Sequence, residues 1–235
     1  MKYYPVLLKL EGRRCLVVGA GGVGTRKVTG LLECDAEVVV VSPEASQQVL
    51  ALAKAGALVY HARRYRPTDL EGMFLVVGAT DDQALNYQIF SDAETRGMLC
   101  NIADRPKVCN FILPAVLRRG DLVVAFSTSG KSPAFARRLR IEMQTRFGPE
   151  YADLLDLMGR IRARLLAEDH APESHKPLFE ALLDGGLLEL LRHDRREQID
   201  VLLRDVLGEG FGFEQLSGPI SDPGEALASP PTSAR

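Results

Sequence analysis

Residues 13–24 decide the fold, and they read RRCLVVGAGGVG. An apolar strand ends at Gly19, where the pattern Gly19-x-Gly21-x-x-Gly24 begins, and a helix follows. Gly19 permits the tight turn off the strand, Gly21 lets the backbone approach a pyrophosphate, and Gly24 allows close helix packing. Because free N–H groups at a helix start bind phosphates, the loop predicts a dinucleotide site. A glycine-rich structural turn is the alternative.

The segments around this loop alternate between strands and helices. Further strands are expected over residues 36–42, 58–61, 73–79 and 99–102, with helices over 23–33, 44–55 and 82–96. Uninterrupted β-branched runs, such as the four valines of residues 38–41, fit strands that are buried on both faces of a parallel sheet. The order predicts an α/β fold, a Rossmann-like doubly wound parallel sheet with right-handed crossovers, over residues 1–112.

The pattern changes near residue 110, where a small α+β segment over residues 113–147 is expected to begin. Strands are expected over residues 111–118 and 122–127, then helices over 133–147, 150–167, 177–191 and 194–207. Asp194 and Glu197 have capping-box spacing at the start of the last helix. A helical C-terminal domain is therefore expected over residues 148–216. The Pro/Ser/Gly/Ala-rich residues 217–235 predict a disordered tail.

The composition excludes several protein classes. The 235-residue chain is 46% apolar and 26% charged, typical of a soluble globular protein. Its longest apolar runs fall far short of the about 20 residues of a membrane helix. No signal-peptide core follows Met1, which predicts a cytoplasmic location. The four cysteines lack metal or disulfide spacing, and no histidine pair has metal-ligand spacing, so mostly buried thiols are expected.

The net charge of −2 hides a strong segmentation of charge. Residues 105–146 carry nine basic and two acidic side chains, a net of +7, whereas residues 147–235 have a net of −8. Such asymmetry bears on binding partners, although solvated helix faces are the plain alternative. The segment shows no recognition helix or aromatic platform, so a nucleic acid is not the expected partner. A membrane is not expected either, because the apolar runs are short.

The tip of the second strand bears on the choice of nucleotide. NAD sites usually have an acidic residue there for the ribose 2′-OH, whereas NADP sites have a nearby cation. This strand ends at Ser42, Glu44 lies two residues on, and no lysine or arginine occurs between Lys27 and Lys54. NAD is therefore favoured, with Ser42, Pro43 and Glu44 forming the adenosine side of the site.

Polar residues follow two further strands at the carboxyl edge of the sheet, where ligands bind in such folds. Thr80 and Asp81 follow one strand, although either could cap the next helix. Asn101 lies near the end of the other and Asp104 follows it, and a carboxylate at position 104 could accept a proton or hold a metal ion. A turn or a salt bridge is the alternative role for Asp104.

Hydroxyl groups and a cation precede the helix that starts at Pro133. The sequence Ser127-Thr128-Ser129-Gly130-Lys131-Ser132 is either an anion-binding loop or an ordinary helix-capping loop. The candidate substrate contacts of the basic segment are Arg118, Ser127, Thr128, Lys131 and Arg137.

Five motifs occur together and in order along the chain. They are residues 17–23 (VVGAGGV) with Arg26-Lys27, residues 79–82 (ATDD), residues 100–104 (CNIAD) with Pro106-Lys107, residues 111–114 (FILP) and residues 127–133 (STSGKSP). Together they resemble the amino-terminal module of the siroheme synthases, a family of precorrin-2 dehydrogenases of which some are also sirohydrochlorin ferrochelatases. The resemblance covers roughly residues 3–165.

The resemblance implies oxidation of precorrin-2 to sirohydrochlorin with NAD⁺, followed in bifunctional members by insertion of Fe²⁺ as a substrate. It implies that Asp104 accepts the proton and assists chelation as a transient metal contact. It implies a homodimer formed through a segment corresponding to residues 113–147, and a polycarboxylate substrate that suits the basic segment. The cofactor contacts are expected to be Gly19, Gly21, Gly22, Val23, Gly24, Ser42, Pro43, Glu44, Thr80 and Asn101.

Departures from the family limit what is carried over. Gly24 is commonly alanine in the family, and either small residue is expected to permit the helix packing. Thr128 stands where some members have a serine that can be phosphorylated. Two alternatives stay open: a dehydrogenase without chelatase activity, and a non-enzymatic NAD-sensing regulatory domain.

Overall fold

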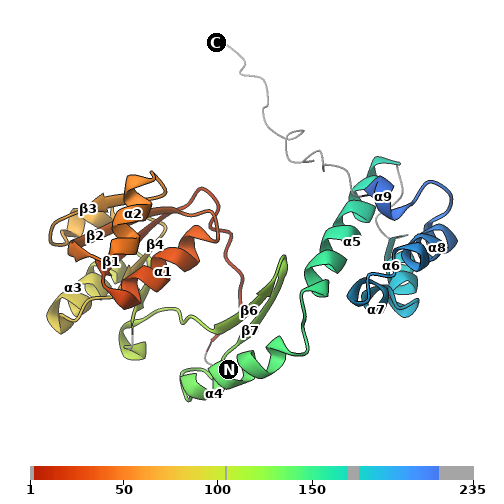
Figure 1. The fold of residues 1–235 in the computed structure, drawn as a ribbon. Helices are drawn as coiled ribbons and strands as arrows, with labels where there is room; N and C mark the ends of the chain where they lie inside the picture. Colours follow the sequence, from red (N-terminus) through yellow and green to blue (C-terminus); the bar gives the residue numbers. More distant parts are fainter. Residues whose placement is uncertain (1–2, 104, 169–174, 217–235) are drawn as a thin grey trace, which may run out of the picture. The chain divides into compact units, whose positions relative to one another are not determined.

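The computed structural model describes residues 3–103, 105–168 and 175–216, whose backbone forms two compact units (Figure 1). The first unit contains the chain up to Leu113 together with Ser127–Ser132. The second contains Pro114–Phe126 and the chain from Pro133 onward. The expected tail over residues 217–235 lies outside the described residues.

The first unit is an α/β domain with one parallel sheet, which confirms the predicted fold class. Its strand order is β3-β2-β1-β4-β5, and all four strand pairings are parallel. The strands are β1 (Arg14–Ala20), β2 (Glu37–Ala45), β3 (Val59–His61), β4 (Leu75–Gly78) and β5 (Leu99–Ile102). The helices are α1 (Gly22–Leu32), α2 (Gln47–Lys54) and α3 (Gln83–Glu94), with short 3₁₀ turns η1 (Pro67–Leu70) and η2 (Pro106–Val108).

Both faces of the sheet are covered, which explains the uninterrupted apolar strands. Alternate residues of a strand point to opposite faces, so Val17 packs with Val28 of α1 and Val49 of α2. Val18 points the other way and packs with Ile89 of α3. Helices α1 and α2 therefore cover one face and α3 covers the other, as the ribbon shows (Figure 1).

One boundary in this unit differs from the expectation. The helix expected from residue 44 begins only at Gln47, because β2 continues to Ala45 and pairs there with Ala20 after an irregularity in register. Ser46 is the N-cap, and its hydroxyl oxygen accepts the Val49 N–H at 3.3 Å. The composition of residues 44–46 favoured a helix, but pairing with β1 extends β2 as far as Ala45.

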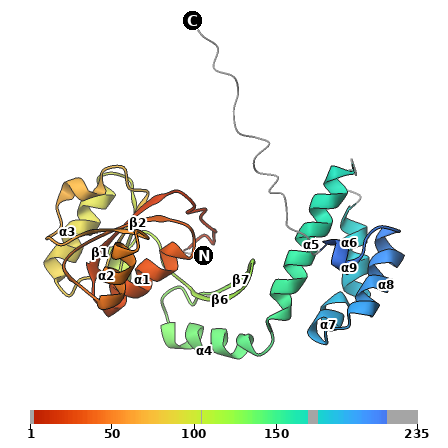
Figure 2. The ribbon, with the colours of Figure 1, turned by 45° about the horizontal axis from the view of Figure 1, so that its top comes forward.

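The second unit begins with an antiparallel hairpin and continues with helices (Figure 2). Its elements are β6 (Ala115–Arg119), β7 (Leu122–Phe126), α4 (Pro133–Gln144), α5 (Glu150–Ala167), α6 (His175–Asp184), α7 (Leu187–Arg192), α8 (Arg196–Leu207) and α9 (Phe213–Leu216). The bounds of α5 are those predicted from the sequence. The strand expected from residue 111 begins only at Ala115, and α4 ends three residues before the expected residue 147.

Two expectations for the helical part are wrong. The helix expected over residues 177–191 is two helices, α6 and α7, separated by Gly185 and by Gly186 at φ +80°. Glycine adopts this left-handed conformation without the strain that a Cβ brings, so the chain turns there. The capping box at Asp194 does not form, because Asp194 itself has φ +49° and the N-cap of α8 is Arg195.

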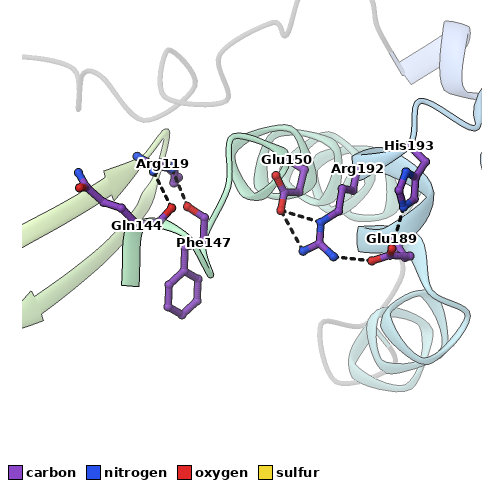
Figure 3. Close-up of polar contacts among 7 residues, drawn as sticks. All are labelled: Arg119, Gln144, Phe147, Glu150, Glu189, Arg192 and His193. Atoms are coloured by element: carbon purple, nitrogen blue, oxygen red, sulfur yellow. Dashed lines mark hydrogen bonds and ion pairs between the residues drawn. The ribbon is translucent and has the colours of Figure 1, made fainter. Parts of the chain in front are cut away.

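The helical part has its own hydrophobic core, built from α5 to α9 and represented by Ile161, Leu182 and Leu203, all fully buried. Polar contacts join the same helices (Figure 3). Arg192 of α7 donates from Nε and Nη2 to Oε1 of the buried Glu150 at the start of α5, both at 3.0 Å. Glu189 accepts from Arg192 and contacts the His193 ring nitrogen.

Arg119 links the hairpin to the end of α4 (Figure 3). Its Nε donates to the Phe147 carbonyl oxygen at 2.8 Å, and its Nη2 donates to the Gln144 carbonyl oxygen at 3.3 Å. The Gln144 carbonyl belongs to the last turn of α4, where acceptors lack intrahelical partners, so the guanidinium caps the helix and also holds Phe147 just beyond it. No helix within the described residues is long and apolar enough to cross a membrane.

Candidate functional site

The glycine loop joins β1 to α1 at the centre of the sheet. The neighbour of β1 on one side is β2, which follows it in the chain, and on the other side is β4. Strand order reverses at this position, and ligands of open α/β sheets bind beside such a switch point at the carboxyl ends of the strands. The sequence placed the loop correctly because both the preceding strand and the following helix have strong local patterns.

The three glycines of the motif have different steric roles. Gly19 has φ +97°, and a Cβ there would overlap the Ala79 carbonyl oxygen. A Cβ on Gly24 would overlap the Gly19 carbonyl oxygen, whereas Gly21 and Gly22 have no atom within 4 Å of that position. Gly19 and Gly24 therefore serve the packing of the loop itself, and Gly21 and Gly22 leave open space beside the backbone.

This geometry corrects one expectation. Alanine at position 24 was expected to fit as well as glycine, because both are small. In this chain the first turn of α1 lies against the Gly19 carbonyl, so an alanine methyl group requires the loop to shift.

The ends of three strands lie next to one another around this loop. The Ala79 N–H donates to the Val18 carbonyl oxygen at 2.7 Å, and the Ala103 N–H donates to the Gly78 carbonyl oxygen at 2.8 Å. These bonds continue the sheet beyond β4 and β5. They bring the segments that follow β1, β4 and β5 to one edge, where the sequence predicted the cofactor contacts.

The adenosine side of the predicted site lies on β2. Ser42 is buried, and its carbonyl oxygen accepts the Tyr60 hydroxyl at 3.0 Å, whereas Pro43 and Glu44 are exposed. The side chain with a free approach from solvent is therefore the Glu44 carboxylate rather than the Ser42 hydroxyl. β3 runs beside β2 and brings Arg63 into the region, a cation that a search along β2 alone does not reveal.

Arg63 is already engaged. Its Nη1 and Nη2 donate to the two carboxylate oxygens of Asp69 at 2.8 and 2.6 Å. The Asp69 side chain is 9% exposed, and burial, which alone would raise its pKa, is outweighed by hydrogen bonds from Arg63 and the Arg66 backbone, so the pKa is lowered. Asp69 therefore stays ionised and holds the guanidinium.

A hydroxyl pair that the sequence analysis missed joins the glycine loop to α2. Thr25 Oγ1 lies 2.8 Å from Ser46 Oγ and donates to the Gly21 carbonyl oxygen at 2.9 Å. Ser46 is the N-cap of α2, so one contact orders both the phosphate loop and the turn after β2. Serine is a favoured N-cap residue, which was the available signal, but the partner of Ser46 lies 21 residues away in the sequence.

The residues after β4 have structural partners. Thr80 Oγ1 lies 2.9 Å from Asn86 Oδ1, and Asn86 Nδ2 donates to the Thr80 carbonyl oxygen at 2.8 Å. The cap of α3 is neither Thr80 nor Asp81, as considered above, but Asp82, whose Oδ1 accepts two backbone N–H groups. Thr80 remains at the predicted edge of the sheet, with its hydroxyl bonded to α3.

The two candidate residues at the end of β5 differ in what the structure describes: Asn101 belongs to the strand, and position 104 follows it. Asn101 is buried, and its Nδ2 donates to the Phe111 carbonyl oxygen at 3.0 Å. Asp104, the predicted proton acceptor and transient metal contact, lies outside the described residues. The described residues contain no group of three or more histidine, cysteine or acidic side chains placed to hold a metal ion.

The predicted substrate contacts fall in both units. Ser127, Thr128 and Lys131 belong to the first unit, whereas Arg118 and Arg137 belong to the second and are exposed. Within the loop, Thr128 Oγ1 accepts the Ser132 N–H at 2.9 Å and Ser127 Oγ accepts the Ser129 N–H at 3.2 Å. Two N–H groups of the suggested anion-binding loop thus bond to its own hydroxyls, while the Lys131 side chain is exposed.

Two of the four thiols expected to be mostly buried, those of Cys15 and Cys100, are buried, whereas Cys34 and Cys109 are partly exposed. Burial raises the pKa of Cys15 to about 11 and that of Cys100 to about 12. Both belong to the sheet core, and neither ionises near neutral pH.

Comparisons with known proteins support a dinucleotide site in the first unit. A family model described as putative NAD(P)-binding matches residues 6–115. The siroheme synthase of Nitrosococcus oceani is 34% identical over 215 residues, and that of Pseudomonas entomophila is 36% identical over 222 residues. The chain is homologous to the siroheme synthases. The resemblance seen in the five motifs is thereby confirmed, and the first unit is an NAD(P)-binding domain.

The extent of the matches matters. The two alignments cover 92% and 94% of this chain but only 46% and 45% of the relatives, so the chain spans less than half their length. A solved structure titled SirC, precorrin-2 dehydrogenase, matches with a TM-score of 0.72 and 27% sequence identity. That match covers 85% of this chain and 98% of the other chain, so the aligned region includes residues of both units.

Proposed function

We propose that the protein oxidises precorrin-2 to sirohydrochlorin with NAD⁺, a step of siroheme biosynthesis. The observation that carries the proposal is the match to the precorrin-2 dehydrogenase over nearly the whole of that protein. The siroheme synthase relatives support the same pathway, although they are about twice as long as this chain. A dinucleotide loop at the switch point of the sheet supplies the site for the electron acceptor.

The reaction removes a hydride and a proton from the tetrapyrrole. The balanced change converts precorrin-2 and NAD⁺ to sirohydrochlorin, NADH and a proton. NAD⁺ supplies the hydride acceptor when bound at the glycine loop. The carboxylate of Asp104, two residues after the end of β5 in the sequence, accepts the proton as a general base.

NAD⁺ rather than NADP⁺ is the proposed cofactor. The exposed carboxylate of Glu44 beside β2 suits a ribose 2′-OH and repels a 2′-phosphate. The nearby guanidinium of Arg63 is held by Asp69 in a two-bond ion pair, so it does not offset that repulsion. A comparison of initial rates with NAD⁺ and NADP⁺ tests this choice, and a preference for NADP⁺ contradicts it.

The basic segment is proposed to bind the carboxylates of the tetrapyrrole. Arg118, Lys131 and Arg137 are exposed, and the segment from 105 to 146 has a net charge of +7. Arginine pairs with carboxylates through two parallel hydrogen bonds, and such a field raises the rate of encounter with a polyanion. Ser127 and Thr128 complete the proposed substrate contacts.

A homodimer through residues 113–147 is also proposed. Val123 of β7 and Phe135 and Ile141 of α4 are large apolar side chains that are exposed in this chain. A two-stranded hairpin is marginal on its own and gains stability when another surface covers it. Sedimentation equilibrium tests the proposal, and a monomer at assay concentrations contradicts it.

A cytoplasmic location is also proposed, and cell fractionation tests it.

The principal experiment mixes the protein with precorrin-2 and NAD⁺ and follows NADH absorbance. We expect NADH formation by the natural chain. We expect Asp104→Asn to lower kcat by about 10²- to 10⁴-fold, the usual contribution of a general base. The Kd for NAD⁺ should be unchanged. Glu71→Gln, which neutralises an exposed carboxylate elsewhere in the same unit, is the matched control.

The outcomes separate the alternatives. No NADH from the natural chain contradicts the dehydrogenase and favours an NAD-binding regulatory domain. Normal turnover by Asp104→Asn contradicts the assigned base. Fe²⁺ is then added as a substrate, and a siroheme spectrum supports a second, chelatase activity with Asp104 as a transient contact. NADH without siroheme identifies a dehydrogenase alone.

A further inference from the structure

Asn110 closes the edge of the sheet beside β5. Its backbone N–H donates to the Cys100 carbonyl oxygen at 3.1 Å, and its side-chain Oδ1 accepts the Cys100 N–H at 2.8 Å. The residue therefore makes both bonds of a strand partner, one from its backbone and one from its side chain. Asn110 Nδ2 also donates to Met98 O at 2.8 Å and to Glu94 Oε1 at 2.7 Å.

Cys109 makes the equivalent contacts two residues further along β5. Its Sγ accepts the Ile102 N–H at 3.1 Å. The same sulfur lies 3.3 Å from the Ile102 carbonyl oxygen and 3.2 Å from the Arg105 carbonyl oxygen, either of which can accept the S–H proton. One thiol thus contacts the residues on both sides of positions 103 and 104.

Asn101 adds the third side chain of this arrangement. Its Nδ2 donates to the Phe111 carbonyl oxygen, so residues 100–102 bond in turn to residues 109–111. We call these two three-residue stretches the neck. Between them the chain makes a loop, residues 103–108, whose first N–H bonds to β4. At the neck, residues 109–111 lie beside β5, the strand from which the loop starts.

The state of the thiol suits this role. Burial raises the pKa of the Cys109 thiol, although the Ile102 hydrogen bond and the Lys27 charge act in the opposite direction. The sulfur therefore carries its proton near neutral pH and can donate to a carbonyl while accepting an N–H. A thiolate could not donate, and an alanine could do neither.

We infer that Cys109 and Asn110 are positioning residues for the dehydrogenation: by closing the neck they fix the chain at Ile102 and Arg105, on either side of Asp104 in the sequence. The inference rests on the proposed function for its reaction, but the hydrogen bonds at the neck are independent of it. Neither side chain has to touch the substrate, because each acts through the backbone on either side of the proton acceptor.

The test compares Cys109→Ala with Cys109→Ser. Alanine removes all the sulfur contacts, so we expect kcat for precorrin-2 oxidation to fall by about 10- to 10²-fold, as misplacement by an ångström can do. Serine keeps a donor and an acceptor at a shorter reach and should recover part of the loss. The Kd for NAD⁺ should not change in either variant. Cys34→Ala, which removes a half-buried thiol after α1, is the matched control.

A second readout does not require turnover. Amide hydrogen exchange over residues 103–108 should accelerate in Cys109→Ala and not in Cys34→Ala. Asn110→Leu, which keeps the bulk but removes the side-chain bonds, should produce the same two effects if Cys109→Ala does not fold. Glu94→Gln keeps the acceptor for Asn110 and serves as its control.

The results distinguish two failures. Turnover by the natural chain together with unchanged kcat in Cys109→Ala and Asn110→Leu overturns the positioning role and leaves the proposed function standing. No turnover by the natural chain overturns the proposed function and, with it, the catalytic part of the inference. In that case unchanged amide exchange over residues 103–108 in Cys109→Ala and Asn110→Leu overturns the structural part as well.

Discussion

The two units of the chain reach their structures by different means. In the first, backbone groups approach one another so closely at the glycine loop that a single Cβ on Gly19 or Gly24 overlaps a carbonyl oxygen. In the second, helices pack through large side chains around Ile161, Leu182 and Leu203, and no described residue of that core belongs to the sheet. The cofactor loop of the first unit depends on backbone geometry, whereas the stability of the second unit depends on the volume of its buried side chains. Mutations should therefore separate the two properties.

The largest effect is expected in the helical core. Ile161→Ala removes a fully buried side chain of α5, and a Leu or Ile to Ala change in a packed core costs about 2–5 kcal/mol. The second unit should then unfold at lower denaturant, while NAD⁺ affinity of the first unit stays the same. Urea unfolding followed by circular dichroism, with NAD⁺ titration of the folded protein, measures both. A parallel loss of NAD⁺ affinity would show that the two units are coupled.

The next effect is expected at the glycine loop. Gly19→Ala introduces a methyl group at φ +97° and against the Ala79 carbonyl. Left-handed strain costs about 1–2 kcal/mol and overpacking about 1–3 kcal/mol, so the first unit should be destabilised by about 2–5 kcal/mol and should lose NAD⁺ binding. Thermal unfolding and isothermal titration with NAD⁺ measure the two losses.

Gly21→Ala is the matched control, because no atom lies within 4 Å of the added methyl group. Its stability should match that of the natural chain, and only its NAD⁺ affinity should fall, since the methyl group occupies the space proposed for the pyrophosphate. An unstable Gly21→Ala protein, or one with full NAD⁺ affinity, contradicts this division of roles.

The smallest effect concerns the ion pair at the start of α5. Burial alone would raise the pKa of Glu150, but its backbone hydrogen bonds and the Arg192 guanidinium outweigh burial and lower that pKa below the usual 4.5. A lowered pKa in the folded state means that the ionised carboxylate stabilises the second unit above pH 4.5. That stabilisation is lost as the pH falls through the lower, folded value.

Glu150→Gln should therefore be less stable than the natural chain at pH 7, by less than Ile161→Ala, because Arg192 is partly exposed to solvent. The difference should shrink as the pH falls below 4.5. Chemical unfolding at a series of pH values measures it. A difference that is constant with pH would contradict ionisation as the source of the stabilisation.

Long elements with strong periodicity could be predicted from the sequence. The apolar strand before Gly19 and the amphipathic α5, whose ends match those predicted, both depend on neighbours within a turn or a strand length. The break at Gly185-Gly186 could not be located, because a glycine pair in a helical pattern is tolerated unless packing requires a turn. The N-cap of α3 is Asp82 rather than Thr80 or Asp81, and this choice is decided by where β4 ends.

The amino-acid sequence by itself determined the α/β order, the glycine loop and the segmentation of charge, because each depends on residue type and short-range spacing. Only the tertiary structure decided how that site is held together. The engagement of Arg63 by Asp69, the contact of Thr25 with Ser46 and the closure of the neck by Cys109 and Asn110 depend on which strand ends meet at one edge. The physical reason is that a hydrogen bond is directional and short, so its partner is chosen by the packed backbone rather than by residue type.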